Sequence, residues 1–255
     1  MKKFKFFTIL AVVCVTVAAV VGGSLAYFTD SKEMTSVFTS GNVYIELTQA
    51  AVKTDEKGNW VQDTERDRVV GGELSHATET NFGALFPGQS IYKDPTIKNV
   101  GSSSAWVAAK VIVTDGVGDI YNVLGYGADG KIDIKALLSG GALSAASSVQ
   151  TWHGISDAHV GGGYAMVQTA DRAAGRYEFY IFMEQELAVN ASTTMFTSMK
   201  IDESCTNEML SEFVEFRITV QAFAVQTFGF ESCFDAMTTA FGAHFTNVAA
   251  LVPSV

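Results

Sequence analysis

Several residue types are scarce in this chain, and each scarcity excludes a class of protein. Only 3 of the 255 residues are proline and only 3 are cysteine, which excludes a collagen-like chain and a scaffold built from disulfides. Charged residues make up 17% of the chain and hydrophobic residues 48%, a balance that excludes a disordered protein. Acidic residues outnumber basic ones, and the formal net charge is −10. We therefore expect no nucleic-acid partner, because phosphate binding needs a basic surface.

Motifs that carry catalytic chemistry are also missing. The chain contains neither H-E-x-x-H nor G-x-S-x-G, and its one G-x-G-x-x-G match, at residues 125–130, has no βαβ context and predicts a turn. His153 and His159 lie in a glycine-rich segment with Asp157 between them. A zinc or copper site there is one interpretation, and solvated loop histidines are the preferred one. We expect no catalytic residue, no metal and no cofactor.

The first 26 residues have the features of an export signal. A short basic start precedes an uncharged apolar run over residues 6–21, two glycines break the run, and residues 24–26 supply a small-x-small pattern. The run is shorter than the ~20 residues of a membrane-spanning helix. We therefore predict cleavage by signal peptidase between Ala26 and Tyr27, instead of a retained membrane helix. The mature chain is expected to be secreted, with no membrane partner after cleavage.

Alternation with period 2 is the strongest structural signal in the mature chain. Apolar residues occupy every second position over residues 43–48, 105–113, 176–184 and 214–226. Such alternation predicts antiparallel strands with one face on a core and one face in water. Pro87 and Pro95 limit the extended stretch at 85–99 to turn and edge positions.

Helical signals are weaker and fall in the connections. Apolar residues recur at helical spacing over 232–248, and short helices are predicted at 132–138 and 208–213. Residues 55–59 predict a turn. Residues 139–175 are rich in Gly, Ala and Ser, and we expect them to form a long excursion from the sheet. The predicted fold is an all-β sandwich with helical insertions.

Several blocks, in order along the chain, resemble a known family. Residues 22–30 read Gly-Gly-Ser-Leu-Ala-Tyr-Phe-Thr-Asp, and residues 38–43 read Phe-Thr-Ser-Gly-Asn-Val. The later blocks are Phe-Pro-Gly-Gln-Ser-Ile at 86–91, Lys-Asp-Pro at 93–95, Lys-Asn-Val-Gly at 98–101, Ala-Trp-Val-Ala at 105–108, and residues 196–201, 206–208 and 218–226. Together they resemble the TasA/camelysin family of secreted biofilm fibre proteins, which are exported with a SipW-type signal peptide.

The resemblance implies an organisation and a function. It implies a signal peptide at 1–26, an N-terminal donor-strand segment at 27–40, and a jelly-roll-like antiparallel β-sandwich over 41–255. The expected function is that of a structural protein of the extracellular matrix or cell surface, which polymerises with itself when the mature N-terminus of one subunit completes a sheet of the next. An accessory protein that anchors or nucleates the fibre is a further candidate partner.

The N-terminal segment is compatible with that role. It is short and free of proline, and Phe28, Met34 and Phe38 share one parity, so three apolar side chains are available for pockets along a groove. Tyr27 and Val37 complete the predicted donor residues. The alternatives are a flexible terminus, or a strand folded back on its own domain.

Two other functions and one covalent feature remain open from the sequence. A monomeric secreted adhesin or binding module is the main alternative, and a camelysin-like metalloprotease, as described for some family members, is a weaker one. Cys205 and Cys233 remain after processing. An exported chain meets oxidising surroundings, so a disulfide between them is a candidate, with two free thiols as the alternative.

Overall fold

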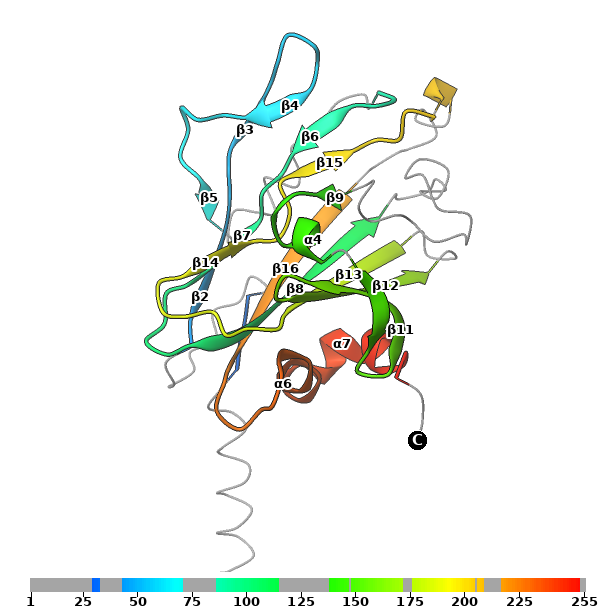
Figure 1. The fold of residues 1–255 in the computed structure, drawn as a ribbon. Helices are drawn as coiled ribbons and strands as arrows, with labels where there is room; N and C mark the ends of the chain where they lie inside the picture. Colours follow the sequence, from blue (N-terminus) through cyan, green and yellow to red (C-terminus); the bar gives the residue numbers. More distant parts are fainter. Residues whose placement is uncertain are drawn as a thin grey trace, which may run out of the picture.

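Strands are the main regular element of the described residues, and they form three sheets (Figure 1). The computed structural model describes residues 29–32, 43–70, 86–114, 138–146, 148–171, 176–204, 206–208 and 217–252. The largest sheet is antiparallel and contains, in spatial order, β1 (Thr29–Lys32), β16 (Arg217–Gln226), β8 (Ala105–Thr114), β13 (Arg176–Met183), β12 (Tyr164–Asp171), β11 (Ile155–Gly161) and β10 (Ser148–Trp152).

Two smaller sheets form the second layer. One contains, in order, β14 (Ser192–Thr194), β7 (Thr96–Asn99), β2 (Ile45–Gln49) and β5 (Val69–Val70). The other contains β3 (Val52–Thr54), β4 (Trp60–Gln62), β6 (Ser90–Tyr92), β15 (Ser198–Lys200) and β9 (Leu138–Ser139). The described helices are α4 (Gly141–Ala145), α6 (Cys233–Ala240) and α7 (Gly242–Ala249). The predicted all-β sandwich with helical insertions is confirmed.

The main core lies between the seven-stranded sheet and the two smaller sheets. Alternate residues of β8, β13 and β16 face it, including Val111, Phe179 and Ala222, each no more than 1% exposed. The smaller sheets contribute Ile45 and Ile97, which are fully buried. These are the period-2 positions of the sequence, so alternation predicted this core correctly.

The other face of the seven-stranded sheet does not lie in water, and that expectation was wrong. Helices α6 and α7 cover it, as Figure 1 shows, and a second core contains Tyr180, Phe182 and Phe223 from the sheet with Phe245 from α7. Burial on both faces explains why β13 carries aromatic residues at odd and even positions. The helices themselves agree with the predicted spacing over 232–248.

The expected excursion at 139–175 was also wrong. Its described residues form β10, β11 and β12, which extend the seven-stranded sheet, and α4, which packs into the main core through Leu143. Small residues are needed here because the backbone passes close to other segments. At Gly141, φ is +57° and an added Cβ would lie 2.4 Å from the Thr194 carbonyl oxygen.

Other predictions have mixed outcomes. The turn at 55–59 is present between β3 and β4, where the Asp55 carboxylate accepts hydrogen bonds from the backbone N–H groups of Lys57 and Asn59. Leu138, placed in a predicted helix, belongs to β9, and most of the two short helices predicted at 132–138 and 208–213 lies outside the described residues. Within the described part of the chain, no helix has the length and apolar character needed to cross a membrane.

Candidate functional site

The candidate site is the outer edge of β16, at one side of the seven-stranded sheet. On its inner side β16 pairs with β8 along all of Arg217–Gln226. On its outer side it pairs only with β1, where Thr29 lies opposite Val225 and Lys32 lies opposite Ala222. Among the described strands, none pairs with the outer edge of residues 217–221. Within the described residues, the pairing on this outer edge therefore ends at Ala222.

The sequence explains why β16 is a long strand whose edge carries none of the residues that block a further strand. Residues 218–230 carry no charged side chain and no proline, and the even positions Ile218, Ala222 and Ala224 are buried in the main core. Lysine, proline or an inward-pointing charge would protect an edge from a further strand, and residues 218–221 contain none of them.

The pairing of β1 with β16 bears on the N-terminal segment. Of the residues 27–38, the structure describes Thr29–Lys32, and these pair with β16 of the same chain. One of the alternatives left open by the sequence, a strand folded back on its own domain, therefore describes these four residues. The predicted donor residues Tyr27, Phe28, Met34, Val37 and Phe38, and the cleavage site Ala26–Tyr27, lie outside the described residues.

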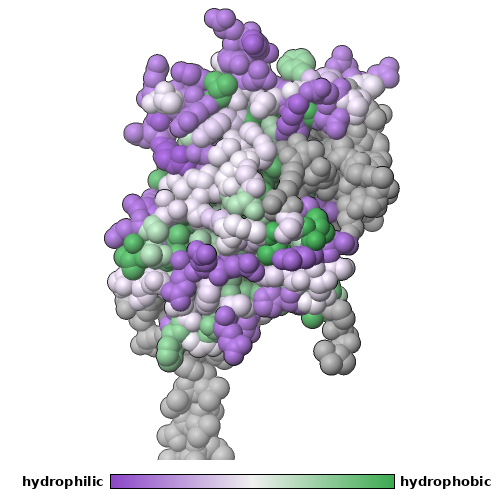
Figure 2. All heavy atoms as spheres, viewed as in Figure 1, coloured by the Kyte–Doolittle hydropathy of each residue, from purple (hydrophilic) through white to green (hydrophobic). Residues whose placement is uncertain are grey.

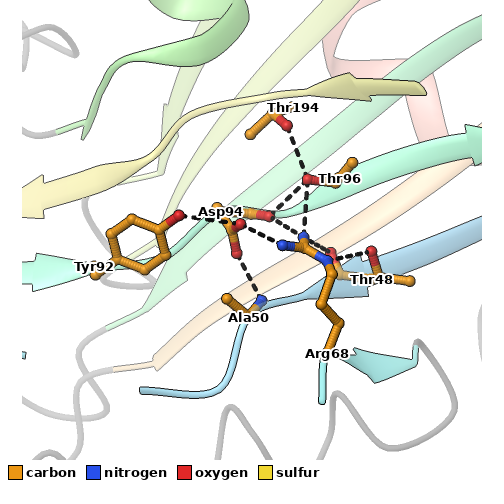
Figure 3. A network of polar contacts seen from close by, with 7 residues as sticks. All are labelled: Thr48, Ala50, Arg68, Tyr92, Asp94, Thr96 and Thr194. Atoms are coloured by element: carbon orange, nitrogen blue, oxygen red, sulfur yellow. Dashed lines mark hydrogen bonds and ion pairs between the residues drawn. The ribbon is translucent and has the colours of Figure 1, made fainter. Parts of the chain in front are cut away.

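A polar network ties the second layer together at the other end of β2 (Figure 3). The Arg68 guanidinium lies 2.6 Å from the Asp94 carboxylate and also donates to the hydroxyl groups of Thr48 and Thr96, at 3.1 Å and 3.0 Å. The other Asp94 carboxylate oxygen accepts the backbone N–H of Ala50 at 2.7 Å. The Thr96 hydroxyl then contacts that of Thr194, so one network joins β2, β7 and β14 to Arg68, the residue that precedes β5.

A buried lysine lies next to this network. The Lys93 side chain is 2% exposed, and its ammonium group donates to the side-chain oxygen of Gln49 at 2.7 Å. Burial lowers the pKa of Lys93 to about 8, while the charge of Asp94 acts in the opposite direction. In the sequence, Lys93 and Asp94 were noted only as part of the Lys-Asp-Pro block at 93–95, and no role was predicted for them.

A second charged network joins the seven-stranded sheet to α7. Glu178 is 3% exposed and accepts hydrogen bonds from Tyr180, from Arg176 and, at 2.9 Å, from Asn247 of α7. The Lys110 ammonium lies 3.1 Å from the same carboxylate. Burial alone raises the pKa of Glu178, but these hydrogen bonds outweigh it and lower the pKa to about 2. Sequence reasoning missed this group, although a glutamate in an otherwise apolar strand was the signal.

The remaining candidate residues do not form a site. Cys233 is a free thiol that is 2% exposed and donates to the Val107 carbonyl at 3.2 Å, and burial raises its pKa. Cys205 lies outside the described residues, so the disulfide stays a prediction. His153 stacks on Phe234 with ring centroids 4.7 Å apart, while His159 belongs to β11. No group of three or more potential metal ligands occurs among the residues that the structure covers.

Comparisons with protein-family models, with curated proteins and with solved structures found no match to this chain.

Proposed function

We propose that the mature chain is a secreted structural protein that polymerises into extracellular fibres by strand exchange at the β16 edge. The observation that carries the proposal is the short pairing of Thr29–Lys32 with Ala222–Val225, on an edge whose other half has no described partner strand. A strand from a second copy that follows the same register would pair with the whole edge. The biofilm matrix is the setting that the family resemblance suggests.

Chain length limits how far pairing within one chain can extend along β16. If the register of β1 continued, position 37 would lie opposite Arg217, at the far end of β16. That end is about 30 Å from the end at which β2 begins, since a strand rises about 3.3 Å per residue. The six steps from position 37 to Val43 span at most about 21 Å. One chain therefore cannot keep this register as far as position 37, whereas a second copy can.

The register also agrees with the parity of the apolar donor residues. Partners in an antiparallel pair point to the same face of the sheet. In the register of β1, position 34 lies opposite Val220 and position 36 opposite Ile218, both on the face that packs on the main core. Met34 of an incoming strand would therefore extend the main core, and Phe28 has the same parity.

Electron microscopy and size-exclusion chromatography of the secreted mature chain test the proposal. The wild-type chain should elongate into fibres, and a chain lacking residues 27–38 should remain a folded monomer, because the strands that form both cores lie outside the deletion. Met34→Asp should also block elongation, since a charge would enter the core face. Thr35→Asp is the matched control, because position 35 has the opposite parity. Fibres from the deleted chain would refute strand exchange at this edge.

A monomeric binding module is the second candidate, and the same pairing favours it. A chain whose β1 stays on its own β16 is closed and has no strand to donate. In that case the wild-type chain stays monomeric at every concentration and age tested, and deletion of residues 27–38 lowers its stability without changing its oligomeric state.

A further inference from the structure

The far edge of the seven-stranded sheet is formed by β10, whose side chains are largely exposed. Among the described strands, β10 pairs with β11 alone, because it is last in the spatial order of the sheet. Residues 148–151 are exposed on both faces of the strand, and Val149 is 56% exposed. Residues 148–156 contain no lysine and no proline, two residue types that protect an edge from a further strand. This edge therefore has the properties of one that accepts a further strand.

The turn after β10 shows which backbone groups of the strand point outward. The turn at 153–154 has positive φ at both residues, +46° and +79°, and joins Trp152 to Ile155. The two residues that flank such a two-residue turn exchange both of their backbone hydrogen bonds. Trp152 therefore directs its N–H and C=O toward β11.

Two residues of β10 direct their backbone groups away from β11. Backbone direction alternates along an antiparallel strand, so Gln150 has the same direction as Trp152, whereas Val149 and Thr151 have the opposite one. The register shift near Thr151 does not change this, because its extra residue lies in β11, between the partners of Gln150 and Trp152. Among the described residues, none bonds the outward N–H and C=O groups of Val149 and Thr151.

Charge is distributed unevenly around β10. Residues 148–156 contain no acidic or basic side chain, although the chain has a net charge of −10. The hairpin of β3 and β4, by contrast, carries Asp, Glu and Lys, and Figure 2 shows strongly hydrophilic surface there, at the top of the view. Two carboxylates border the Trp152 end of β10: Asp157 lies in the register shift of β11, and Glu184 accepts the Trp152 indole N–H at 2.5 Å. Two copies that meet along β10 therefore repel each other least when these ends are apart.

We propose that β10 is a self-association edge, at which the β10 strands of two copies pair antiparallel about a two-fold axis. An identical strand suits this edge because the antiparallel arrangement places the acidic end of each copy beside Ser148 of the other. The two Trp152 ends are then about 13 Å apart along the strand direction, since each of the four steps from Ser148 to Trp152 rises about 3.3 Å. The contact goes beyond strand exchange at β16, because β10 lies at the opposite end of the sheet.

One register uses every outward group of Val149 and Thr151. When Gln150 lies opposite its own counterpart, Val149 of each copy lies opposite Thr151 of the other, and each of these two pairs exchanges two backbone hydrogen bonds. Val149 then packs on the Thr151 methyl group, a favourable cross-strand pair. The two Gln150 residues form the central pair, which has no backbone hydrogen bonds and Cα atoms about 4.5 Å apart.

The size of the contact determines where it forms. A standard protein interface contains about 20–30 residues a side, and β10 has five residues. A single pair of β10 strands therefore associates weakly, and the isolated chain should be largely monomeric in dilute solution. Copies held in one fibre present many β10 edges at once, so the same contact would join fibres side by side.

Disulfide trapping tests this register in the mature chain, on a background with Cys205→Ala and Cys233→Ala. Gln150→Cys should form a covalent dimer in glutathione buffer at least tenfold faster than Ser148→Cys, as measured on non-reducing gels. Both positions are exposed on the same face of β10. In the proposed pair, however, the two residues at position 148 are about 13 Å apart, too far for a disulfide.

A second variant tests the backbone hydrogen bonds. Val149→Pro, added to Gln150→Cys, should lower the rate of dimer formation to that of Ser148→Cys, because proline removes an outward N–H. Pairing with β11 does not use this N–H, so circular dichroism with urea titration should show a folded domain.

The outcomes separate this inference from the proposed function. Equal dimer formation by Gln150→Cys and Ser148→Cys would overturn the inference, and so would the absence of a covalent dimer from both, as expected if an extended peptide of another protein takes the edge. Fibres from the wild-type chain would leave strand exchange in place in either case. A wild-type chain that forms no fibres, while Gln150→Cys dimerises selectively, would overturn strand exchange at β16 and leave the β10 contact in place.

Discussion

Acidification should destabilise the domain chiefly through Glu178, whose carboxylate joins the seven-stranded sheet to α7. Its pKa is lowered from an ordinary value of 4.5 to about 2 by four hydrogen-bonding partners that outweigh its burial. Because the folded pKa lies below the ordinary one, this contribution is present above about pH 4.5 and is lost as the pH falls toward 2. At about 1.4 kcal/mol per pKa unit, the full contribution is about 3 kcal/mol.

Urea titrations from pH 7 to pH 2.5 measure this loss as a fall in the free energy of unfolding. About 2 kcal/mol should disappear by pH 3. Glu178→Gln keeps the size of the side chain but leaves the Lys110 ammonium, 7% exposed, without its carboxylate. We expect this variant to be less stable at pH 7 by about 3 kcal/mol and to lose little more between pH 4.5 and pH 3.

The control is Glu203→Gln, because the Glu203 side chain is 75% exposed and pairs with the half-exposed Lys200. That variant should keep the pH dependence of the wild type and change stability by less than about 1 kcal/mol. If Glu178→Gln retains the wild-type fall in stability between pH 4.5 and pH 3, then Glu178 is not the group responsible and the reasoning fails.

Three further predictions concern the polar network, the cysteines and processing. Asp94→Ala should cost about 2–3 kcal/mol in urea titration, because it leaves the buried backbone N–H of Ala50 without its acceptor and removes the carboxylate partner of the half-exposed Arg68, which keeps its hydrogen bonds to Thr48 and Thr96; a loss below 1 kcal/mol would contradict this. Cys233 should resist alkylation in the native protein, since its thiol is buried, and should be alkylated once the unreduced protein is unfolded, because that thiol is free; an unmodified Cys233 in the unfolded, unreduced protein would instead indicate the disulfide with Cys205. Mass spectrometry of secreted protein should find residue 27 at the N-terminus, and residues before 24 in the mature protein would exclude the predicted cleavage site.

Period-2 alternation predicted the main core because the residues of one strand face are buried together between the sheets. Phe179 and Ala222 are examples of every second residue that faces the main core. These positions are apolar because they are buried against the smaller sheets. The expectation of a face in water failed at β13, where Tyr180 and Phe182 pack in the second core with α6 and α7. A strand buried on both faces carries apolar residues at odd and even positions alike. The aromatic run of β13 was therefore the sequence feature that indicated burial of its second face.

The candidate site was predictable only in part. The donor segment was inferred from residues 27–38, but its acceptor edge depends on the order of strands, and β16 pairs with β1 nearly two hundred residues away in sequence. Polar groups such as Asp94 and Glu178 were missed for the same reason. Their partners, Ala50 and Asn247 among them, are brought close only by the fold.

In the proposed fibre, β16 of one copy accepts the N-terminal strand of another. Interchain disulfide formation tests it most directly, with Met34→Cys in one chain and Val220→Cys in a second, differently tagged chain, both on a background lacking the native cysteines. Opposite residues of an antiparallel pair have Cα atoms about 4.5–5.5 Å apart, which suits a disulfide. We expect an interchain disulfide in mixed fibres, and a much lower yield of cross-linked chains when Thr35→Cys replaces Met34→Cys. Fibres that form without any bond between positions 34 and 220 would contradict it.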